Sequence, residues 1–123
     1  DTPLDGIIAT NATTHPEGLK TSKEELRKRG GGAVSGAPLT ERAIEVVRRV
    51  HERCNGTYPI IGVGGLMTGD DVKRMMEAGA TLVQVYTGFV YNGVGFAGDL
   101  CKSLLATETS EPTEPTETAD NQQ

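Results

Sequence analysis

The sequence lacks tryptophan and has few other aromatic residues, with three tyrosines and two phenylalanines among 123 residues. With so few aromatics and no basic stripe, we expect no nucleic-acid partner. No apolar run approaches the ~20 residues that span a bilayer, and the first residues lack the basic start of a signal peptide. Cys54 and Cys101 have no metal-ligand or CxxC spacing, so we expect reduced, partly buried thiols in a reducing compartment and no metal site.

Basic residues are missing from the end of the chain. Residues 107–123 carry five acidic residues, no basic residue and no large apolar residue, so they account for the whole net charge of −5. A Thr/Glu/Pro repeat of this kind cannot bury enough apolar surface to offset the entropy of ordering. We therefore expect one domain over residues 1–106 and a disordered acidic tail over residues 107–123.

Three short apolar runs predict the strands of that domain. They cover residues 6–9, 59–63 and 82–86, and only the third has a polar residue inside it, Gln84. Nearly continuous runs rich in β-branched residues are typical of parallel strands that are covered on both faces. Each run is followed by a loop and then by a helical pattern.

The helical patterns have recognisable starts and apolar stripes. Thr40 is the expected N-cap of a helix that ends near residue 55, and Thr68 with Asp71 predicts a capping box for the next helix. In that helix we expect Met75 and Met76 to fill the core. A third helix should bury Phe96, Leu100 and Leu104, and residues 22–29 predict a short surface helix.

Three strand–loop–helix units indicate an α/β fold with a parallel sheet. A (β/α)₈ TIM barrel needs about 250 residues, so about 100 folded residues hold only about three of its eight units. Three parallel strands alone would expose two edges and half of an apolar interior. We therefore expect an incomplete TIM barrel, namely the C-terminal three or so βα units of a longer one.

The ends of the predicted strands favour a phosphate site. Thr10-Asn11, Gly64-Gly65 and Thr87-Gly88 follow the three runs, and glycines let main-chain N–H groups approach an anion closely. The alternative is that the glycines only form tight turns. Asn11 has its own two interpretations, a polar contact to a planar ligand or a simple turn residue.

The strings DGIIATNATT, AVSGAPL and YPIIGVGGLMTGDDVKRMMEAGATLVQVYTGFVYNG resemble the dihydroorotate dehydrogenase family, and its class 2, quinone-dependent branch in particular. The resemblance covers residues 5 to about 105. It implies an FMN-dependent oxidoreductase of pyrimidine (UMP) biosynthesis that oxidises dihydroorotate to orotate and passes electrons to a membrane quinone.

The resemblance also assigns roles to residues. FMN would be held by Thr10, Ser35, Gly36, Gly64, Gly65, Tyr86 and Thr87. The substrate would meet Asn11 and Ala12, where Ala12 replaces the hydroxyl residue that the family usually has. The family's Gly-Gly-Leu-Ser-Gly loop corresponds to residues 32–36, and the segment before this loop is a few residues longer than is usual in the family.

No catalytic residue is expected in this chain, because the family's serine base and flavin-contacting lysine lie upstream. The membrane-docking helices lie upstream as well, so a peripheral location is expected through that region, on the cytoplasmic face of the cell membrane or on the mitochondrial inner membrane. Two alternatives remain, an inactive partial barrel and another FMN- or phosphate-binding barrel oxidoreductase.

Overall fold

The computed structural model describes residues 3–14, 19–30 and 32–109. Its centre is a three-stranded parallel sheet in the order β1 (Ile7–Ala9), β2 (Ile60–Val63) and β3 (Leu82–Gln84). Ile7 lies beside Ile60, and Ile61 lies beside Leu82. The three predicted runs are therefore strands, each shorter than its run by one or two residues.

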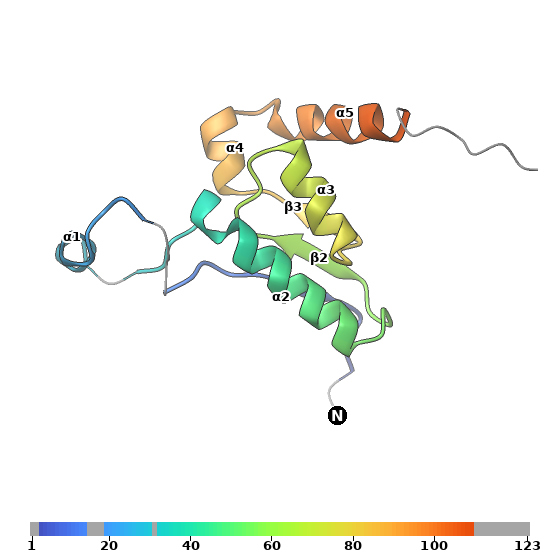
Figure 1. Cartoon of the computed structure of the whole chain (residues 1–123), viewed down its shortest axis with the longest axis horizontal. Helices are drawn as coiled ribbons and strands as arrows, with labels where there is room; N and C mark the ends of the chain where they lie inside the picture. The colour runs from blue at the N-terminus through green and yellow to red at the C-terminus, as the bar shows by residue number, and fades with distance from the viewer. Residues whose placement is uncertain (1–2, 15–18, 31, 110–123) are drawn as a thin grey trace, which may run out of the picture.

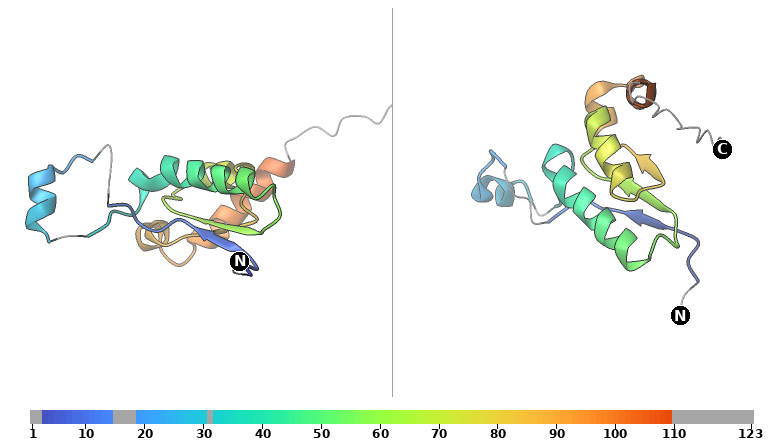
Figure 2. Two further views of the ribbon diagram at one scale, coloured as in Figure 1. Left: turned by 90° about the horizontal axis from the view of Figure 1, so that it is seen from below. Right: turned by 45° about the vertical axis from the view of Figure 1, so that its right-hand side comes forward.

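Helices cover one face of this sheet. Helix α2 (Thr40–Arg53) packs on β1 and β2, and helix α3 (Gly69–Glu77) packs on β3 and beside α2. Figure 2 shows both helices on the same side of the strands. Between them lies the core, where four large side chains are fully buried: Val47, Ile60, Val72 and Met75.

The other face of the sheet is open, so the expectation of strands covered on both faces is wrong for this chain, whereas the expected exposure of half of an apolar barrel interior is confirmed. Ile8 is 66% exposed and Leu82 is 62% exposed. Side chains alternate along a strand, and the register places Ile8, Ile61 and Leu82 in one row across the sheet. The same apolar run thus has one buried and one exposed face because this chain supplies a layer on only one side.

The described residues form three further helices (Figure 1). Helix α4 (Thr87–Asn92) follows β3 directly, and helix α5 (Phe96–Thr109) packs on α3 through Phe96, Leu100 and Leu104. Helix α1 (Lys23–Lys28) buries no residue and projects away from the sheet. A short 3₁₀ turn (Ala37–Leu39) leads into α2.

The helix starts were predicted with mixed success. The capping box is confirmed, because Thr68 Oγ1 accepts from the Asp71 N–H and Asp71 accepts from the Thr68 N–H. Ser22 caps α1 in the same way at 3.2 Å from Glu25 N. Thr40, however, is not a side-chain cap. It is the first residue of α2, and its hydroxyl donates to carbonyl oxygens.

Three other expectations need correction. Met76 is 42% exposed, because α3 turns only Met75 and Val72 toward the sheet. Cys101 is exposed rather than partly buried, since it lies on the outer side of α5. The expected tail begins too early, because α5 continues to Thr109 and each added residue of a formed helix gains a hydrogen bond. Residues 110–123 lie outside the described residues.

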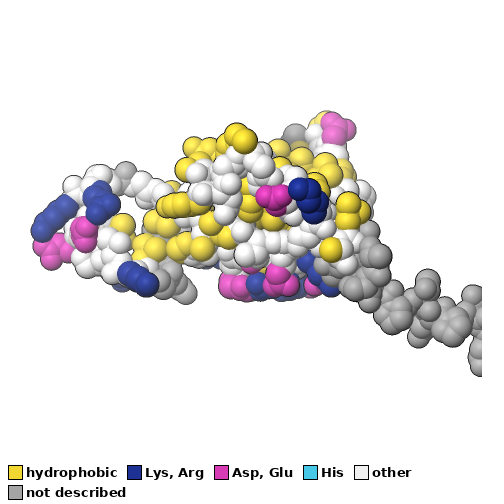
Figure 3. Space-filling model, turned by 90° about the horizontal axis from the view of Figure 1, so that it is seen from above, with side chains coloured by type: hydrophobic (Ala, Val, Ile, Leu, Met, Phe, Trp, Pro, Cys, Tyr) yellow, Lys and Arg dark blue, Asp and Glu magenta, His cyan; other side chains and the backbone are white. Residues whose placement is uncertain are grey.

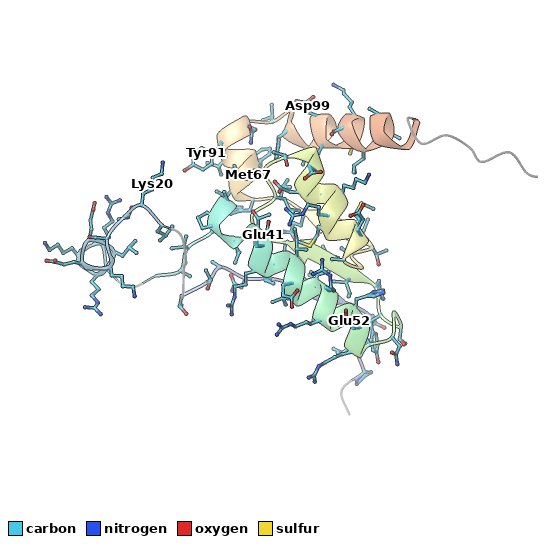
Figure 4. The ribbon with its side chains drawn as sticks, in the orientation of Figure 1. Lys20, Glu41, Glu52, Met67, Tyr91 and Asp99 are labelled. Atoms are coloured by element: carbon cyan, nitrogen blue, oxygen red, sulfur yellow. The ribbon has the colours of Figure 1, made fainter. Side chains whose placement is uncertain are left out.

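Figure 3 shows a broad apolar area in the middle of one face of the molecule, with charged side chains grouped along its lower edge and a further acidic and basic pair inside the area. On α2, Glu45 pairs with Arg48 at 3.0 Å and with Arg49 at 2.7 Å. Glu41 reaches across to Arg74 on α3 at 2.6 Å (Figure 4 labels Glu41). Helices α2 and α3 therefore turn their charges away from the sheet. Within the described ranges, no helix combines the length and the apolar character needed to cross a bilayer.

Candidate functional site

A cavity of about 270 Å³ lies at the carboxyl ends of the three strands. The loops that follow β1, β2 and β3 line it, together with the segment before α2. It is lined by every one of the nine predicted site residues: Thr10, Asn11, Ala12, Ser35, Gly36, Gly64, Gly65, Tyr86 and Thr87. The structure thus brings together residues that are up to 77 positions apart in the sequence, because parallel strands end at the same edge. The individual roles of these residues stay predictions.

Gly64 and Gly65 form the turn after β2, and neither position has room for a side chain. Their φ angles are +132° and +73°, in the region that favours glycine. A Cβ on Gly64 would lie 3.0 Å from Thr10 Oγ1, and a Cβ on Gly65 would meet the main chain of Thr40. The turn therefore presents bare main chain to the cavity.

Hydroxyl groups hold the loops around the cavity to one another. Thr10 Oγ1 donates to the Val63 carbonyl at 3.2 Å. The Ser35 and Thr87 hydroxyls lie 2.8 Å apart and form one hydrogen bond. These two contacts connect the end of β1 to β2, and the segment before α2 to the start of α4.

The long loop between β1 and α2 is closed at its base. Thr13 and Val34 form an antiparallel bridge, with N–O distances of 3.0 and 2.8 Å. This bridge returns the chain to the cavity before Ser35, so the extra residues of the loop extend outward with α1. Ala12 and Ser35 consequently reach the same cavity despite the 22 residues between them.

Asn11 has both a local contact and a place in the cavity. Its Oδ1 accepts from the Ala12 N–H at 2.7 Å, which is the turn role that was one of its two interpretations. Its side-chain NH₂ group is a hydrogen-bond donor. Ala12 contributes its methyl group and main chain in place of a hydroxyl.

Helix α4 starts at the cavity and was not predicted. The N–H groups in the first turn of a helix have no partner within the helix, and here that turn begins at Thr87. Gly88 permits the helix to approach so closely, because a Cβ there would meet the Leu66 carbonyl and the Phe96 ring. Tyr86, just before α4, is 74% exposed.

Gln84 and Thr40 lie at or near the cavity, and the sequence assigned neither of them a role in the site. Gln84 lines the cavity, and its signal was its place as the one polar residue inside an apolar run. Thr40 lies outside the lining but touches Gly65, with its hydroxyl 2.6 Å from the Gly65 carbonyl. No sequence pattern indicated this contact, because the two residues are 25 positions apart.

The cavity has no charged side chain in its described lining. Any anion there would be held by main-chain N–H groups, hydroxyls and amides. The resolved pKa shifts belong to helix-surface residues instead: hydrogen bonds from Arg74 and Arg49 lower the pKa values of Glu41 and Glu45 respectively. Across the described residues, no group of three or more His, Cys, Asp or Glu side chains is placed to hold a metal ion.

The family model described as dihydroorotate dehydrogenase matches residues 1–107. The chain is 48% identical over 117 residues to a dihydroorotate dehydrogenase (quinone) of Thermosynechococcus vestitus, covering 90% of this chain and 32% of that protein. It is 44% identical over 113 residues to the protein of the same name in Kineococcus radiotolerans, covering 89% and 31%. The chain therefore spans about a third of the length of these curated relatives.

Solved structures agree with the sequence comparison. A DHODH from Eimeria tenella, crystallised in complex with ferulenol, superposes with a TM-score of 0.77 and 36% identity over 86% of this chain and 27% of that one. The ligand-free form gives a TM-score of 0.76 and 33% identity, covering 87% and 30%. These neighbours are TIM barrels, so the expected α/β fold, an incomplete part of such a barrel, is confirmed.

Proposed function

This chain belongs to the dihydroorotate dehydrogenase family, and from that membership we propose that it supplies the FMN-phosphate site and part of the substrate site of a dihydroorotate dehydrogenase (quinone). The complete enzyme would oxidise dihydroorotate to orotate in pyrimidine biosynthesis. The observation that supports this most is the single cavity that contains all nine residues expected to bind cofactor and substrate.

The residues present fit the phosphate of FMN. Gly64 and Gly65 have no side chains and present their main chain to the cavity, and the first turn of α4 adds N–H groups without helical partners. The Thr87 hydroxyl lies beside them. A phosphate needs several N–H and O–H donors in a small space, and the cavity offers them without a carboxylate in its described lining.

The chain's other residues would orient the two reactants. Thr10, Ser35 and Gly36 would lie along the flavin. The side-chain amide of Asn11 would form hydrogen bonds with the edge of the planar pyrimidine ring. When bound, the flavin supplies the acceptor for the hydride that leaves dihydroorotate. Ala12 would shape the substrate pocket through its main chain, with one hydrogen bond fewer, worth about 0.5–1.5 kcal/mol.

The remaining steps belong to residues outside this chain. The family resemblance implies a serine as the proton acceptor, in the part of the barrel upstream of this chain, so proton removal would belong to a residue outside it. The quinone, and a peripheral association with the cytoplasmic face of the cell membrane or with the mitochondrial inner membrane, would likewise involve a further region. We propose the quinone because the relatives carry that word in their names.

A second proposal is favoured by the open face of the sheet. Ile8 and Leu82 are more than half exposed, as expected for strands whose barrel partners are absent. The chain alone would then be a partial barrel without turnover, able to hold FMN phosphate at most.

The phosphate site can be tested on the 123-residue chain by flavin fluorescence. We expect FMN to bind at least about tenfold more tightly than riboflavin, because only FMN has the charged group that the turn and α4 would hold. Gly65→Ala should abolish this difference, since the methyl group would meet Thr40.

Gly30→Ala is the matched control. Gly30 also has a positive φ, of +82°, but a Cβ there would meet nothing within 4 Å. It should keep the preference for FMN. Equal affinities of the unmodified chain for FMN and riboflavin would contradict the phosphate site.

Turnover needs the complete barrel. The chain should be joined to the upstream part of the T. vestitus relative, and dihydroorotate added without a quinone. We expect the flavin of the joined protein to lose its visible absorbance. The flavin bound to the 123-residue chain alone should keep its absorbance. Retained absorbance in a folded, FMN-loaded joined protein would contradict the proposed activity.

A further inference from the structure

Thr40 is the buried residue that connects α2 to the cavity turn. It is 8% exposed, and its hydroxyl lies 2.6 Å from the Gly65 carbonyl oxygen and 2.9 Å from the Ala37 carbonyl oxygen. The hydroxyl has one proton to donate, and the shorter distance is to Gly65. This contact joins residues that are distant in sequence.

Gly65 is in direct contact with Thr40. A Cβ on Gly65 would clash with the main chain and the hydroxyl of Thr40. The main chain of Gly65 therefore packs directly against Thr40. Gly65 and Leu66 line the cavity, whereas Thr40 does not. Thr40 therefore supports the turn from outside the cavity and has no place in its lining.

The direction of one peptide group follows from this arrangement. The Gly65 carbonyl oxygen accepts a hydrogen bond from the Thr40 hydroxyl, so the oxygen end of this peptide group is directed toward α2. The peptide bond between Gly65 and Leu66 is planar and trans, and its N–H group points opposite to its carbonyl. In this orientation the N–H group would attract an anion in the cavity. If the peptide group were turned over, its carbonyl oxygen would face the anion and repel it.

We propose that Thr40 is a positioning residue for the phosphate site, because its hydroxyl fixes the Gly65–Leu66 peptide with the carbonyl held away from the cavity. This inference rests on the proposed FMN-phosphate site and names a residue that acts on it without touching the ligand. Thr10, Ser35 and Thr87 also form hydroxyl contacts, but they line the cavity, so their substitution would remove direct contacts as well.

The test compares Thr40→Val with Thr40→Ser in the full 123-residue chain. Valine keeps the buried shape and removes the donor, so FMN affinity should fall about tenfold, the value of one hydrogen bond to a charged group. Riboflavin affinity should stay the same, because riboflavin has no phosphate. Serine keeps the hydroxyl and should keep the ratio of the two affinities.

Thr81→Val is the matched control at the other end of the sheet. Thr81 Oγ1 accepts from the Ile60 N–H at 3.4 Å, at the start of the strands and away from the cavity. Its loss should lower the melting temperature slightly and leave the FMN-to-riboflavin ratio unchanged. If Thr40→Val does not fold, Thr40→Cys replaces it, since a thiol is a weak donor of similar size.

The outcomes separate the two proposals. A folded Thr40→Val chain with an unchanged affinity ratio would show a role in packing only and overturn the inference. Loss of the ratio in a folded Thr40→Ser chain would overturn it as well. An unmodified chain that does not distinguish FMN from riboflavin would overturn the proposed phosphate site itself, and the inference with it.

Discussion

The two faces of the sheet differ although their residues are alike. On the covered face, Ile60 is fully buried among Val47, Val72 and Met75. On the open face, Ile8 belongs to the neighbouring strand and is 66% exposed. Both are isoleucines in short apolar runs, so their difference comes only from the layer that packs above them.

This difference shows how a barrel's stability is divided among its parts. The outer helical layer is local, because α2 and α3 pack on strands next to them in the chain. The inner layer of a TIM barrel is filled by side chains from alternate strands around the whole barrel. Three strands can therefore complete the outer layer and still leave the inner one open.

Replacing the two isoleucines by alanine should give the largest contrast. Ile60→Ala should lower the free energy of unfolding by about 2–5 kcal/mol, because it leaves a cavity in a packed core. Ile8→Ala should change it by less than about 0.5 kcal/mol, as for exposed positions. Urea unfolding followed by circular dichroism measures both.

Similar decreases in the free energy of unfolding for the two substitutions would contradict the exposure of Ile8 on an open face. A large cost for Ile8→Ala that grows with protein concentration would indicate that copies of the chain cover one another's open faces. Large exposed apolar surfaces commonly pair in this way.

The strands and the cavity could be predicted from the sequence because both follow from local patterns. Apolar runs indicated the strands, and parallel strands bring their carboxyl ends together, so Thr10, Gly65 and Thr87 had to meet. The identity of the ligand came from the family resemblance, since glycine turns alone fit many anions.

Other features depend on contacts that no local pattern reveals. Helix α4 has only six residues and contains Gly88, whose helical placement depends on the ring of Phe96 and the Leu66 carbonyl. Met75 and Met76 have the same side chain, and only the orientation of α3 decides which one is buried. Thr40 satisfied the rule for an N-cap, but a tertiary contact with Gly65 determines where its hydroxyl points.

Loss of an N-cap should lower the free energy of unfolding more for α3, which covers the sheet, than for α1, which covers no part of it. Thr68→Ala removes the capping box of α3 and should lower the free energy of unfolding by about 1 kcal/mol. Ser22→Ala removes the N-cap hydrogen bond of α1, a helix that buries no residue. Its effect on global unfolding should be close to zero, and local fraying of α1 should appear in amide hydrogen exchange. Equal effects on global unfolding would mean that α1 also packs on the folded core.

The ion pair between the covering helices should give the smallest effect. Arg74 Nη2 donates to both oxygens of Glu41, and this hydrogen bond lowers the pKa of Glu41 below its ordinary value. A lowered pKa stabilises the folded chain above the ordinary glutamate value of about 4.3, and the contribution is lost as the pH falls through the lower folded value. Because both groups are exposed, salt should screen the contribution.

Arg74→Gln should therefore reduce the loss of stability as the pH falls below about 5 in low salt, and the difference between the variant and the unmodified chain should disappear in about 1 M salt. Arg49→Gln is the matched control, because it removes a pair with Glu45 within α2 and leaves the contact between helices intact. Both variants should lose some acid dependence, but only Arg74→Gln should also increase hydrogen exchange near the end of α3, where Arg74 lies. Identical exchange in the two variants would mean that the pair acts within each helix and contributes nothing to the layer that covers the sheet.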